Sequence, residues 1–233
     1  VTTVGITGTR GKSTTTHLIA HILKTAGRNT FIGGNIRDMA TLPLLGEVRA
    51  GDFVVLELDS WQLQGFGESK VSPHVAVFTN MMSDHLNYYK SDPKRYLEDK
   101  SNIFKYQNAE DFLILGEGLD VGEGLGERII ASVANVPKEW NIKIPGVHNL
   151  LNIACAIEAC KALSISEGDI KKGVESFTGV EGRLQFLKES NGIKIYNDNN
   201  STTPDATIAA LRALGSNSKN IVLILGGDDK GLD

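Results

Sequence analysis

The sequence predicts an α/β fold in which helices flank a mostly parallel sheet on both faces. Short apolar runs such as 52–58 (DFVVLEL) and 74–79 (HVAVFT) indicate fully buried strands. Helix-length segments separate these runs, as in repeated strand–helix–strand units. Continuous apolar strands of this kind are typical of parallel sheets that are covered on both faces.

The elements of the first part follow in order. A strand at 4–7 leads into a helix over about 12–26, whose apolar residues fall on one face and which Gly27 is suited to end. A glycine-rich, charged stretch at 116–127 is expected to be a surface loop. Further strands are expected at 52–58, 74–79, 112–115 and 129–130.

The second part of the chain has a different pattern. After helices at about 148–163 and 167–177, two short strands at 184–188 and 193–196 flank Ser190-Asn191-Gly192, a hairpin turn signal. A helix at about 204–214 and a strand at 220–225 (NIVLIL) are expected to follow.

These patterns place a domain boundary near residue 181, giving units 1–181 and 182–233. The second unit has only about fifty residues, which is small for a core of its own. The chain also opens on Val1, already inside a strand-like run. We therefore expect it to be a segment of a longer protein.

Composition excludes several classes of function. The 233 residues carry a net charge of −4, which argues against a general nucleic-acid or membrane binder. No apolar run approaches the roughly 18 residues that span a bilayer. Cys155 and Cys160 have a spacing that suits neither a metal pair nor a disulfide scaffold, so a reducing cytoplasm is expected.

A glycine-rich loop, Gly8-Thr9-Arg10-Gly11-Lys12-Ser13-Thr14, joins the first strand to the first helix. Such a loop turns backbone N–H groups toward phosphate oxygens at a helix N-terminus. Lys12 would neutralise the β- and γ-phosphates, and the Ser13 hydroxyl would bind Mg²⁺. The common spacing G-x-x-x-x-G-K-[ST] fails because its first glycine falls on Ile6. The alternative is a glycine-rich turn with a solvated lysine.

Candidate metal ligands follow two of the expected strands. Glu57 ends the run VVLE, where a carboxylate would face the phosphate loop, although it is equally compatible with an ordinary strand-end acid. Asp84 and His85 follow the strand at 74–79, as metal ligands or in a structural role. Lys100, by its chemistry alone, is expected to be a solvated helix lysine.

Together the motifs resemble the Mur ligase family of ATP-dependent amino-acid-adding enzymes of peptidoglycan synthesis. The motifs that carry the resemblance occur in one order: the loop at 8–14, E-L-x-S-x-Q-L at 57–63, D-H-L at 84–86, G-V-H-N-x-x-N at 146–152, Arg183, and Asn197-Asp198. The resemblance implies a P-loop-type central ATPase domain, followed by the first part of a Rossmann-like C-terminal domain. It also implies ATP and Mg²⁺, with two metal sites.

The resemblance assigns roles to individual residues. Lys12 and the loop backbone would hold the ATP phosphates, Ser13 and Glu57 one Mg²⁺, and His85 a second metal. Lys100 would be the lysine that many members carry as a carbamate near that metal. The remaining implied contacts are Asn149, Asn152, Arg183 and Asp198 for ATP, Asn35, Ser60 and Gln62 for the muramoyl substrate, and Thr202 and Lys230 for the incoming amino acid.

Within the family, residues 33–36, 57–63 and 226–231 are most similar to members that add D-glutamate to UDP-N-acetylmuramoyl-L-alanine. This implies a monomer acting through an acyl phosphate. Two positions depart from that pattern, Asp59 for a frequent Ser and Asn200 for a frequent Lys. The alternatives are another muramyl ligase, a folylpolyglutamate synthase-like ligase, a P-loop switch NTPase, or an ATP-binding fragment that is inactive on its own.

Overall fold

The computed structural model describes residues 1–36, 39, 41–82, 88–89, 92–201, 203–215 and 220–227. The first part of the chain alternates strands and helices, as the sequence predicts. Its elements are β1 (Thr2–Thr7), α1 (Lys12–Thr25), β2 (Thr30–Gly34), α2 (Leu44–Glu47), β3 (Phe53–Glu57), α3 (Ser60–Ser69), β4 (Val75–Phe78), α4 (Pro93–Ser101), β5 (Phe112–Gly116), β6 (Glu127–Ala131), a 3₁₀ turn (Val133–Asn135), α5 (Val147–Ala162) and α6 (Glu167–Ser176).

Six parallel strands form the main sheet, in the order β2-β3-β1-β4-β5-β6. This confirms the predicted fold class. The loop between β5 and β6 is also as predicted, whereas the edge strand β2 was not predicted. Its short sequence TFIGG ends in two glycines, which weaken a strand signal.

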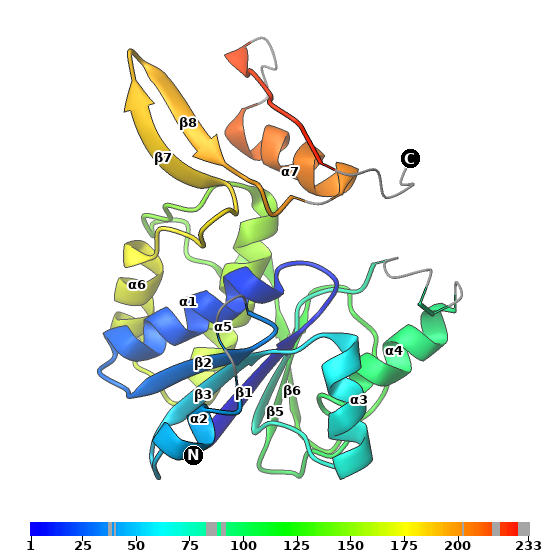
Figure 1. The fold of residues 1–233 in the computed structure, drawn as a ribbon. Helices are drawn as coiled ribbons and strands as arrows, with labels where there is room; N and C mark the ends of the chain where they lie inside the picture. Colours follow the sequence, from blue (N-terminus) through cyan, green and yellow to red (C-terminus); the bar gives the residue numbers. More distant parts are fainter. Residues whose placement is uncertain are drawn as a thin grey trace.

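Helices cover both faces of this sheet (Figure 1). Alternation along β3 divides its side chains, with Val55 facing the core beneath α1, α5 and α6. Val54 and Leu56 face a second core that includes Leu63 of α3. The carboxyl ends of the strands therefore emerge between two rigid layers, where α/β folds bind ligands.

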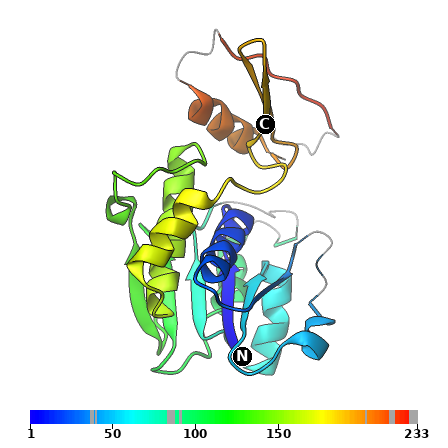
Figure 2. The same cartoon turned by 90° about the vertical axis from the view of Figure 1, so that its left-hand side faces the viewer.

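The remaining elements form a smaller unit at one end of the molecule, where two perpendicular views both place it (Figures 1 and 2). An antiparallel hairpin joins β7 (Gln185–Ser190) to β8 (Ile193–Asn197), and α7 (Pro204–Leu214) follows it. Asn191 and Gly192 adopt positive φ angles of 52° and 78°, which confirms the predicted turn.

The strand predicted at 220–225 is wrong for the described chain. Residues 221–227 pair with no strand in the part of the chain that the structure describes. Val222 and Ile224 are 92% and 91% exposed, so their apolar pattern has no neighbouring strand to complete it. Apolar periodicity indicates strand propensity, but a strand forms only where another backbone pairs with it.

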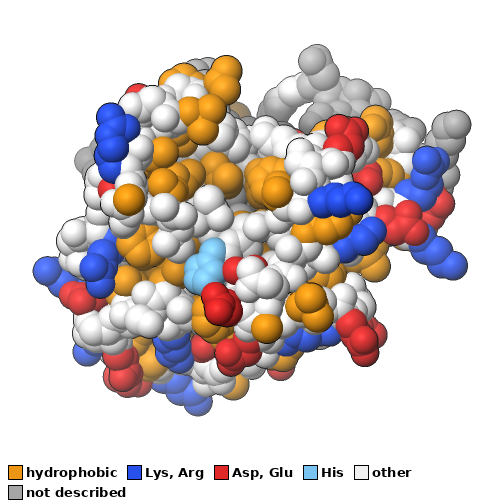
Figure 3. Space-filling view, turned by 90° about the horizontal axis from the view of Figure 1, so that it is seen from below, with side chains coloured by type: hydrophobic (Ala, Val, Ile, Leu, Met, Phe, Trp, Pro, Cys, Tyr) orange, Lys and Arg blue, Asp and Glu red, His pale blue; other side chains and the backbone are white. Residues whose placement is uncertain are grey.

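The surface has no single charged field on the face shown in Figure 3, where acidic and basic side chains are interspersed. Among the described residues, no helix is both long enough and apolar enough to cross a membrane.

Candidate nucleotide-binding site

The loop between β1 and α1 has a backbone that only glycine accommodates at two positions. Gly8 has a φ of 142°, and a Cβ there would lie 2.1 Å from the Thr79 hydroxyl oxygen. Gly11, the N-cap of α1, has a φ of 83°, and a Cβ there would lie 2.1 Å from Asn152 Oδ1. The glycines thus permit both the curl of the loop and its close packing.

The end of β4 holds this loop in place. Asn80 Oδ1 accepts from the Arg10 backbone N–H at 2.9 Å, and Asn80 O accepts from the Thr9 N–H at 3.0 Å. The Thr79 hydroxyl donates to Arg10 O at 2.6 Å. The sequence does not signal these two supporting residues, although Thr79 ends the strand predicted at 74–79 and Asn80 follows it.

Two lysines converge on the same loop. Lys12 Nζ donates to Gly8 O at 3.1 Å. Lys100 Nζ donates to Gly8 O and to the Thr7 hydroxyl, both at 3.1 Å, and lies 4.9 Å from the centre of the Tyr96 ring. Lys100 is only 1% exposed, so its interpretation as a solvated helix lysine is wrong. The turn of α4 directs it beneath the loop, a tertiary effect that the polar sequence PKRYLEDKS does not signal.

Glu57 ends β3 beside the loop and is 4% exposed. Burial raises the pKa of its carboxyl, while a hydrogen bond from the Ser13 hydroxyl and the charges of Lys12 and Arg183 oppose the shift. Its Oε2 has no hydrogen-bond partner. An unsatisfied buried carboxylate oxygen next to a serine hydroxyl is an oxygen donor set of the kind that Mg²⁺ prefers.

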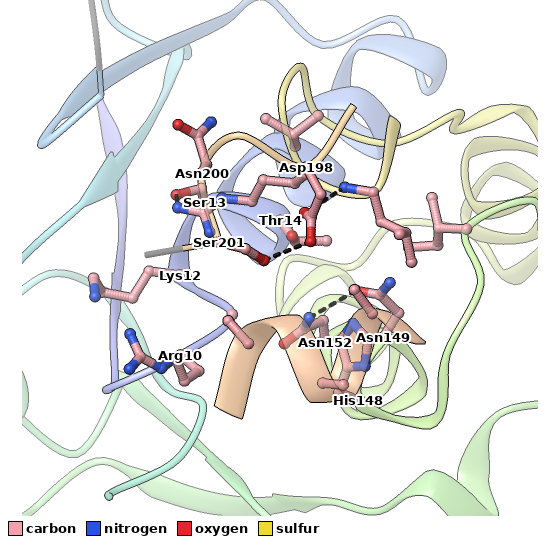
Figure 4. Close-up of a pocket in the computed structure, with 18 of the residues that line it drawn as sticks. Arg10, Lys12, Ser13, Thr14, His148, Asn149, Asn152, Asp198, Asn200 and Ser201 are labelled. Carbon is pink, nitrogen blue, oxygen red and sulfur yellow. Dashed lines mark hydrogen bonds between the residues drawn. The ribbon is translucent and has the colours of Figure 1, made fainter. Parts of the chain in front are cut away.

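A cavity of about 340 Å³ opens in front of the loop. Both units line it: the main unit contributes the phosphate loop, Glu57 and the start of α5, and the smaller unit contributes Arg183, Asp198 and α7. Figure 4 shows Lys12 and Arg10 on one side of this cavity, with Asn149, Asn152 and His148 on the other. The cavity therefore combines a cationic, N–H-rich end with an amide-rich end.

Hydrogen bonds fix the polar groups at the amide-rich end. Asn149 Nδ2 donates to Pro145 O at 2.7 Å, and Asn152 Nδ2 donates to Asn149 Oδ1 at 3.1 Å. The two amides lie one turn apart on α5, which places them on the same face. Burial lowers the pKa of neighbouring His148, an effect that the negative charge of Asp198 opposes.

The smaller unit contributes an arginine and a carboxylate. Arg183 Nη2 donates to the Ser13 hydroxyl at 3.3 Å. Asp198 accepts from the Leu184 backbone N–H at 2.8 Å and from the Ser201 hydroxyl. Both residues line the cavity, so the structure brings them together with the loop as the sequence implied.

The residues expected to contact the muramoyl substrate follow the carboxyl ends of β2 and β3, close to Glu57 in the chain or in the sheet, but none of them lines this cavity. The Asn35 backbone N–H donates to Glu57 O at 2.7 Å. Ser60 is 1% exposed. Gln62 is engaged in a capping box at the start of α3, where its side chain accepts from the Asp59 N–H at 3.1 Å. Serine and aspartate are both good N-caps, which explains why Asp59 fits where Ser is frequent.

Four candidate site residues, Asp84, His85, Thr202 and Lys230, lie outside the described residues. Within the ranges that are described, no group of three or more His, Cys, Asp or Glu side chains forms a metal cluster. Cys155 and Cys160 are free thiols, and both are buried in α5.

Residues 6–131 match the family model described as the Mur ligase middle domain, and this match covers more than half of the chain. The chain belongs to the Mur ligase family. The matched range begins inside β1 and ends at the last residue of β6, so it takes in the other five strands of the parallel sheet together with the phosphate loop, Glu57 and Lys100.

Curated relatives of this Mur ligase chain include two named UDP-N-acetylmuramoylalanine–D-glutamate ligase. The protein from Clostridium kluyveri is 37% identical over 253 residues, covering 97% of this chain and 53% of its own length. The protein from Acetivibrio thermocellus is 37% identical over 254 residues, covering 97% of this chain and 52% of its own. The chain thus spans about half the length of the curated relatives that it matches.

Solved structures of two MurF ligases and of FolC share the fold. MurF from Acinetobacter baumannii is 23% identical with a TM-score of 0.76, covering 91% of this chain and 54% of its own. MurF from Thermotoga maritima, in complex with ADP, is 23% identical with a TM-score of 0.71, covering 91% and 56%. Escherichia coli FolC in complex with DHPP and ADP is 20% identical with a TM-score of 0.69, covering 93% and 66%.

Proposed function

We propose that this chain is the ATP-binding part of a ligase that joins D-glutamate to UDP-N-acetylmuramoyl-L-alanine, in the cytoplasm and as a monomer. The observation that carries the proposal is Glu57, a buried carboxylate with an unpartnered oxygen beside Ser13 and the phosphate loop. Binding of a nucleoside triphosphate needs a metal site next to a phosphate loop, because the negative charge of its phosphates must be neutralised from several sides.

We assign the ATP contacts as follows. The loop backbone from Gly8 to Thr14 and Lys12 hold the phosphates at the cationic end of the cavity. Asn149 and Asn152 address the base at the amide-rich end, and Arg183 and Asp198 reach the nucleotide from the smaller unit. All of these residues except Gly8 line the cavity, which supports this assignment.

Ser13 and Glu57 would hold one Mg²⁺, and the residues present fit that ion. When bound, the ion supplies positive charge between the phosphate oxygens. Arg183 donates to the Ser13 hydroxyl and contributes its charge near Glu57, so this arginine helps to hold the hydroxyl and carboxylate in place. His85 and Lys100, the latter as a carbamate, are proposed for a second ion.

A carboxylate lacks a good leaving group, so it must be activated before an amine can attack it. A carboxylate oxygen of the muramoyl substrate attacks the γ-phosphorus of ATP, and ADP leaves, which gives an acyl phosphate. The amine of D-glutamate then attacks the acyl carbon and loses a proton, and inorganic phosphate leaves to give the amide. The cations on the loop stabilise the charge that develops during the phosphoryl transfer.

The choice of D-glutamate is supported by the names of the relatives, at 37% identity along nearly the whole chain. We place the muramoyl substrate near Asn35, Ser60 and Gln62, and the amino acid near Thr202 and Lys230. We also keep the domain boundary between residues 181 and 182, where the sheet-based unit gives way to the hairpin.

The test uses the full-length protein that contains this chain. We expect ATP consumption only when UDP-N-acetylmuramoyl-L-alanine and D-glutamate are both present, with one amide formed per ADP. Equal turnover with a diamino acid, or with a folate and L-glutamate, would overturn the D-glutamate assignment.

The isolated chain provides a second, separate measurement. Calorimetry with ATP and Mg²⁺ is expected to show nucleotide binding without formation of the amide, because the chain spans about half of the relatives' length. Failure to bind nucleotide would contradict the assigned loop, independently of which amino acid the full-length enzyme uses.

A further inference from the structure

One contact joins the tip of the phosphate loop to the smaller unit. Arg10 Nη2 donates to the Thr203 hydroxyl at 3.1 Å, across 193 positions of sequence. The contact is separate from the one between Arg183 and Ser13, because it reaches a helix rather than the segment that links the two units.

The loop end of this contact is fixed. The backbone N–H of Arg10 donates to Asn80 Oδ1, and its carbonyl oxygen accepts from both the Thr79 hydroxyl and Asn80 Nδ2. The main sheet therefore fixes the backbone of Arg10. A hydrogen bond from its guanidinium consequently positions the bonded group relative to the loop.

The other end of the contact is the start of α7. Thr203 is the N-cap of this helix, and its hydroxyl accepts from the Ala206 N–H while Pro204 occupies the first turn. One face of α7, made of Ala206, Ala209 and Ala210, lines the cavity. Figure 4 shows α7 crossing the cavity between Arg10 and Asn152. The position of Thr203 therefore determines the position of α7, which forms one wall of the cavity.

We propose that Arg10 is a positioning residue that acts through Thr203. Its guanidinium sets the N-terminus of α7 against the phosphate loop and so places residues 198–201, which precede the helix, over the bound phosphates. Because Thr202 is expected to face the amino acid, the contact couples occupation of the phosphate loop to assembly of the amino-acid site. This part rests on the proposed function.

Arginine suits this role because of its shape. Its planar guanidinium donates in fixed directions, whereas a lysine presents a compact point charge on a flexible stem. A hydrogen bond from a charged donor is also stronger than one between neutral groups. An asparagine at this position would lack both the reach and the charge.

The first experiment measures placement without any activity. Spin labels on cysteines at K172C and K188C report the distance between the two units, since both positions are exposed and the native Cys155 and Cys160 are buried. With ATP and Mg²⁺ bound, we expect one narrow distance distribution. Arg10→Met and Thr203→Val should each broaden it, and the double variant should broaden it no further.

Two controls separate the contact from the capping of α7. Thr203→Ser keeps the hydroxyl and should restore the narrow distribution. Ser166→Ala removes the N-cap of α6, away from the cavity, and should leave it unchanged. Arg10→Met keeps the Thr203 cap intact. An unchanged distribution in Arg10→Met would overturn the proposal even if Thr203→Val disturbed the helix.

The second experiment uses the full-length ligase. Loss of the contact in Thr203→Val is expected to raise the KM for the amino acid about tenfold, with the Kd for ATP unchanged. If Arg10→Met instead weakened ATP binding tenfold and left the distances unchanged, Arg10 would be a phosphate ligand and the proposal would fall. If the wild type made no amide while the distances shifted as expected, the proposed function would fall and the positioning role would stand.

Discussion

Lys12 and Lys100 donate to the same acceptor, the carbonyl oxygen of Gly8, each at 3.1 Å. They reach it from different helices: Lys12 is the first residue of α1, and Lys100 lies in the last turn of α4. Lys100 is buried, whereas Lys12 lines the cavity. The two ammonium groups thus share one anchor but face different surroundings, which predicts different consequences when each is removed.

Lys12→Ala should abolish tight nucleotide binding with little effect on the fold. The partly exposed ammonium donates to the loop carbonyl oxygens of Gly8 and Thr9 at 3.1 and 3.4 Å, and we propose that its charge stabilises the ATP phosphates. We expect the turnover of the full-length enzyme to fall by about two orders of magnitude or more. Lys24→Ala, at the exposed end of the same helix, is the control. Near-normal turnover in Lys12→Ala would contradict the assigned loop.

Gly11→Ala tests the close packing of the loop against α5. A Cβ at this position meets Asn152 Oδ1 at 2.1 Å and also requires a φ of 83°. Gly27 has a similar φ of 72°, but a Cβ there meets nothing within 4 Å. Gly27→Ala should therefore cost only the left-handed strain, about 1 to 2 kcal/mol in the free energy of unfolding.

Gly11→Ala should cost more than this and should also prevent nucleotide binding. Denaturant unfolding and calorimetry on the same two variants separate the strain from the collision. Equal losses of stability, with ATP affinity retained in both, would show that Asn152 moves aside.

Glu57→Gln should affect stability and metal dependence in opposite directions. The buried carboxylate has an unpartnered oxygen, so a neutral isostere removes a desolvation cost and should raise the melting temperature without nucleotide. The Mg²⁺-dependent part of the ATP affinity should fall at least about tenfold. Titrations with and without Mg²⁺ measure the difference.

The control for this variant is Glu158→Gln. Glu158 is also buried, but its carboxylate is paired with Lys161 at 2.9 Å, so neutralising it should lower the melting temperature and leave Mg²⁺ dependence alone. A Glu57→Gln protein that melts lower, with unchanged Mg²⁺ dependence, would assign Glu57 to the fold rather than to the ion.

The sequence predicts the parts of this site whose chemistry is local. The phosphate loop and Glu57 are recognisable because each follows a strand whose apolar run is visible. Burial of Lys100 is not recognisable, since α4 is polar along its length and only its packing against α3 and the sheet places one lysine beneath the loop. The support from Asn80 likewise depends on β4 lying next to β1, which is a matter of sheet order.

The same distinction explains the error at 220–225. That segment has the residue types of a buried strand, but strand formation needs a partner, and nothing in a segment's own composition reports whether one is adjacent. The β7–β8 turn was predictable because its whole signal, Asn191-Gly192 between two short runs, is contained in one stretch.

Stability should fall as the pH drops from about 7.5 to about 6. Burial lowers the pKa of His17 and His21 below 6.5, with Lys24 adding to both shifts and Arg183 to the first. The unfolded chain therefore takes up protons at a higher pH than the folded protein, so acidification favours unfolding. Glu57, whose pKa is raised, acts in the opposite direction over its own range above 4.5.

Melting temperatures at the two pH values measure this effect. His17→Gln and His21→Gln should each reduce the pH dependence, with His21→Gln also losing the 2.7 Å hydrogen bond between Nε2 and the Ser176 hydroxyl. A melting temperature that stays constant or rises on acidification would contradict the assignment.

Lys100→Ala tests whether this buried lysine acts as an ammonium or as an anionic carbamate. The substitution removes a side chain that is 1% exposed, so we expect a loss of about 2 to 5 kcal/mol in unfolding free energy and a space beneath the loop. Lys100→Met fills that space without either charge and serves as the control. Both variants of the full-length enzyme should lose turnover.

Short carboxylic acids should restore turnover to Lys100→Ala, because they place an anionic oxygen where the carbamate would lie, and should leave Lys100→Met inactive. Short alkylamines distinguish the other case, since they replace the ammonium that donates to Gly8 O and to the Thr7 hydroxyl. Rescue by the amine alone would make Lys100 a support of the phosphate loop and would remove it from the metal site. Rescue by the acid alone would show that turnover requires an anionic oxygen at this position, as the carbamate would supply. The ammonium that donates to the loop would then not be the active form of Lys100.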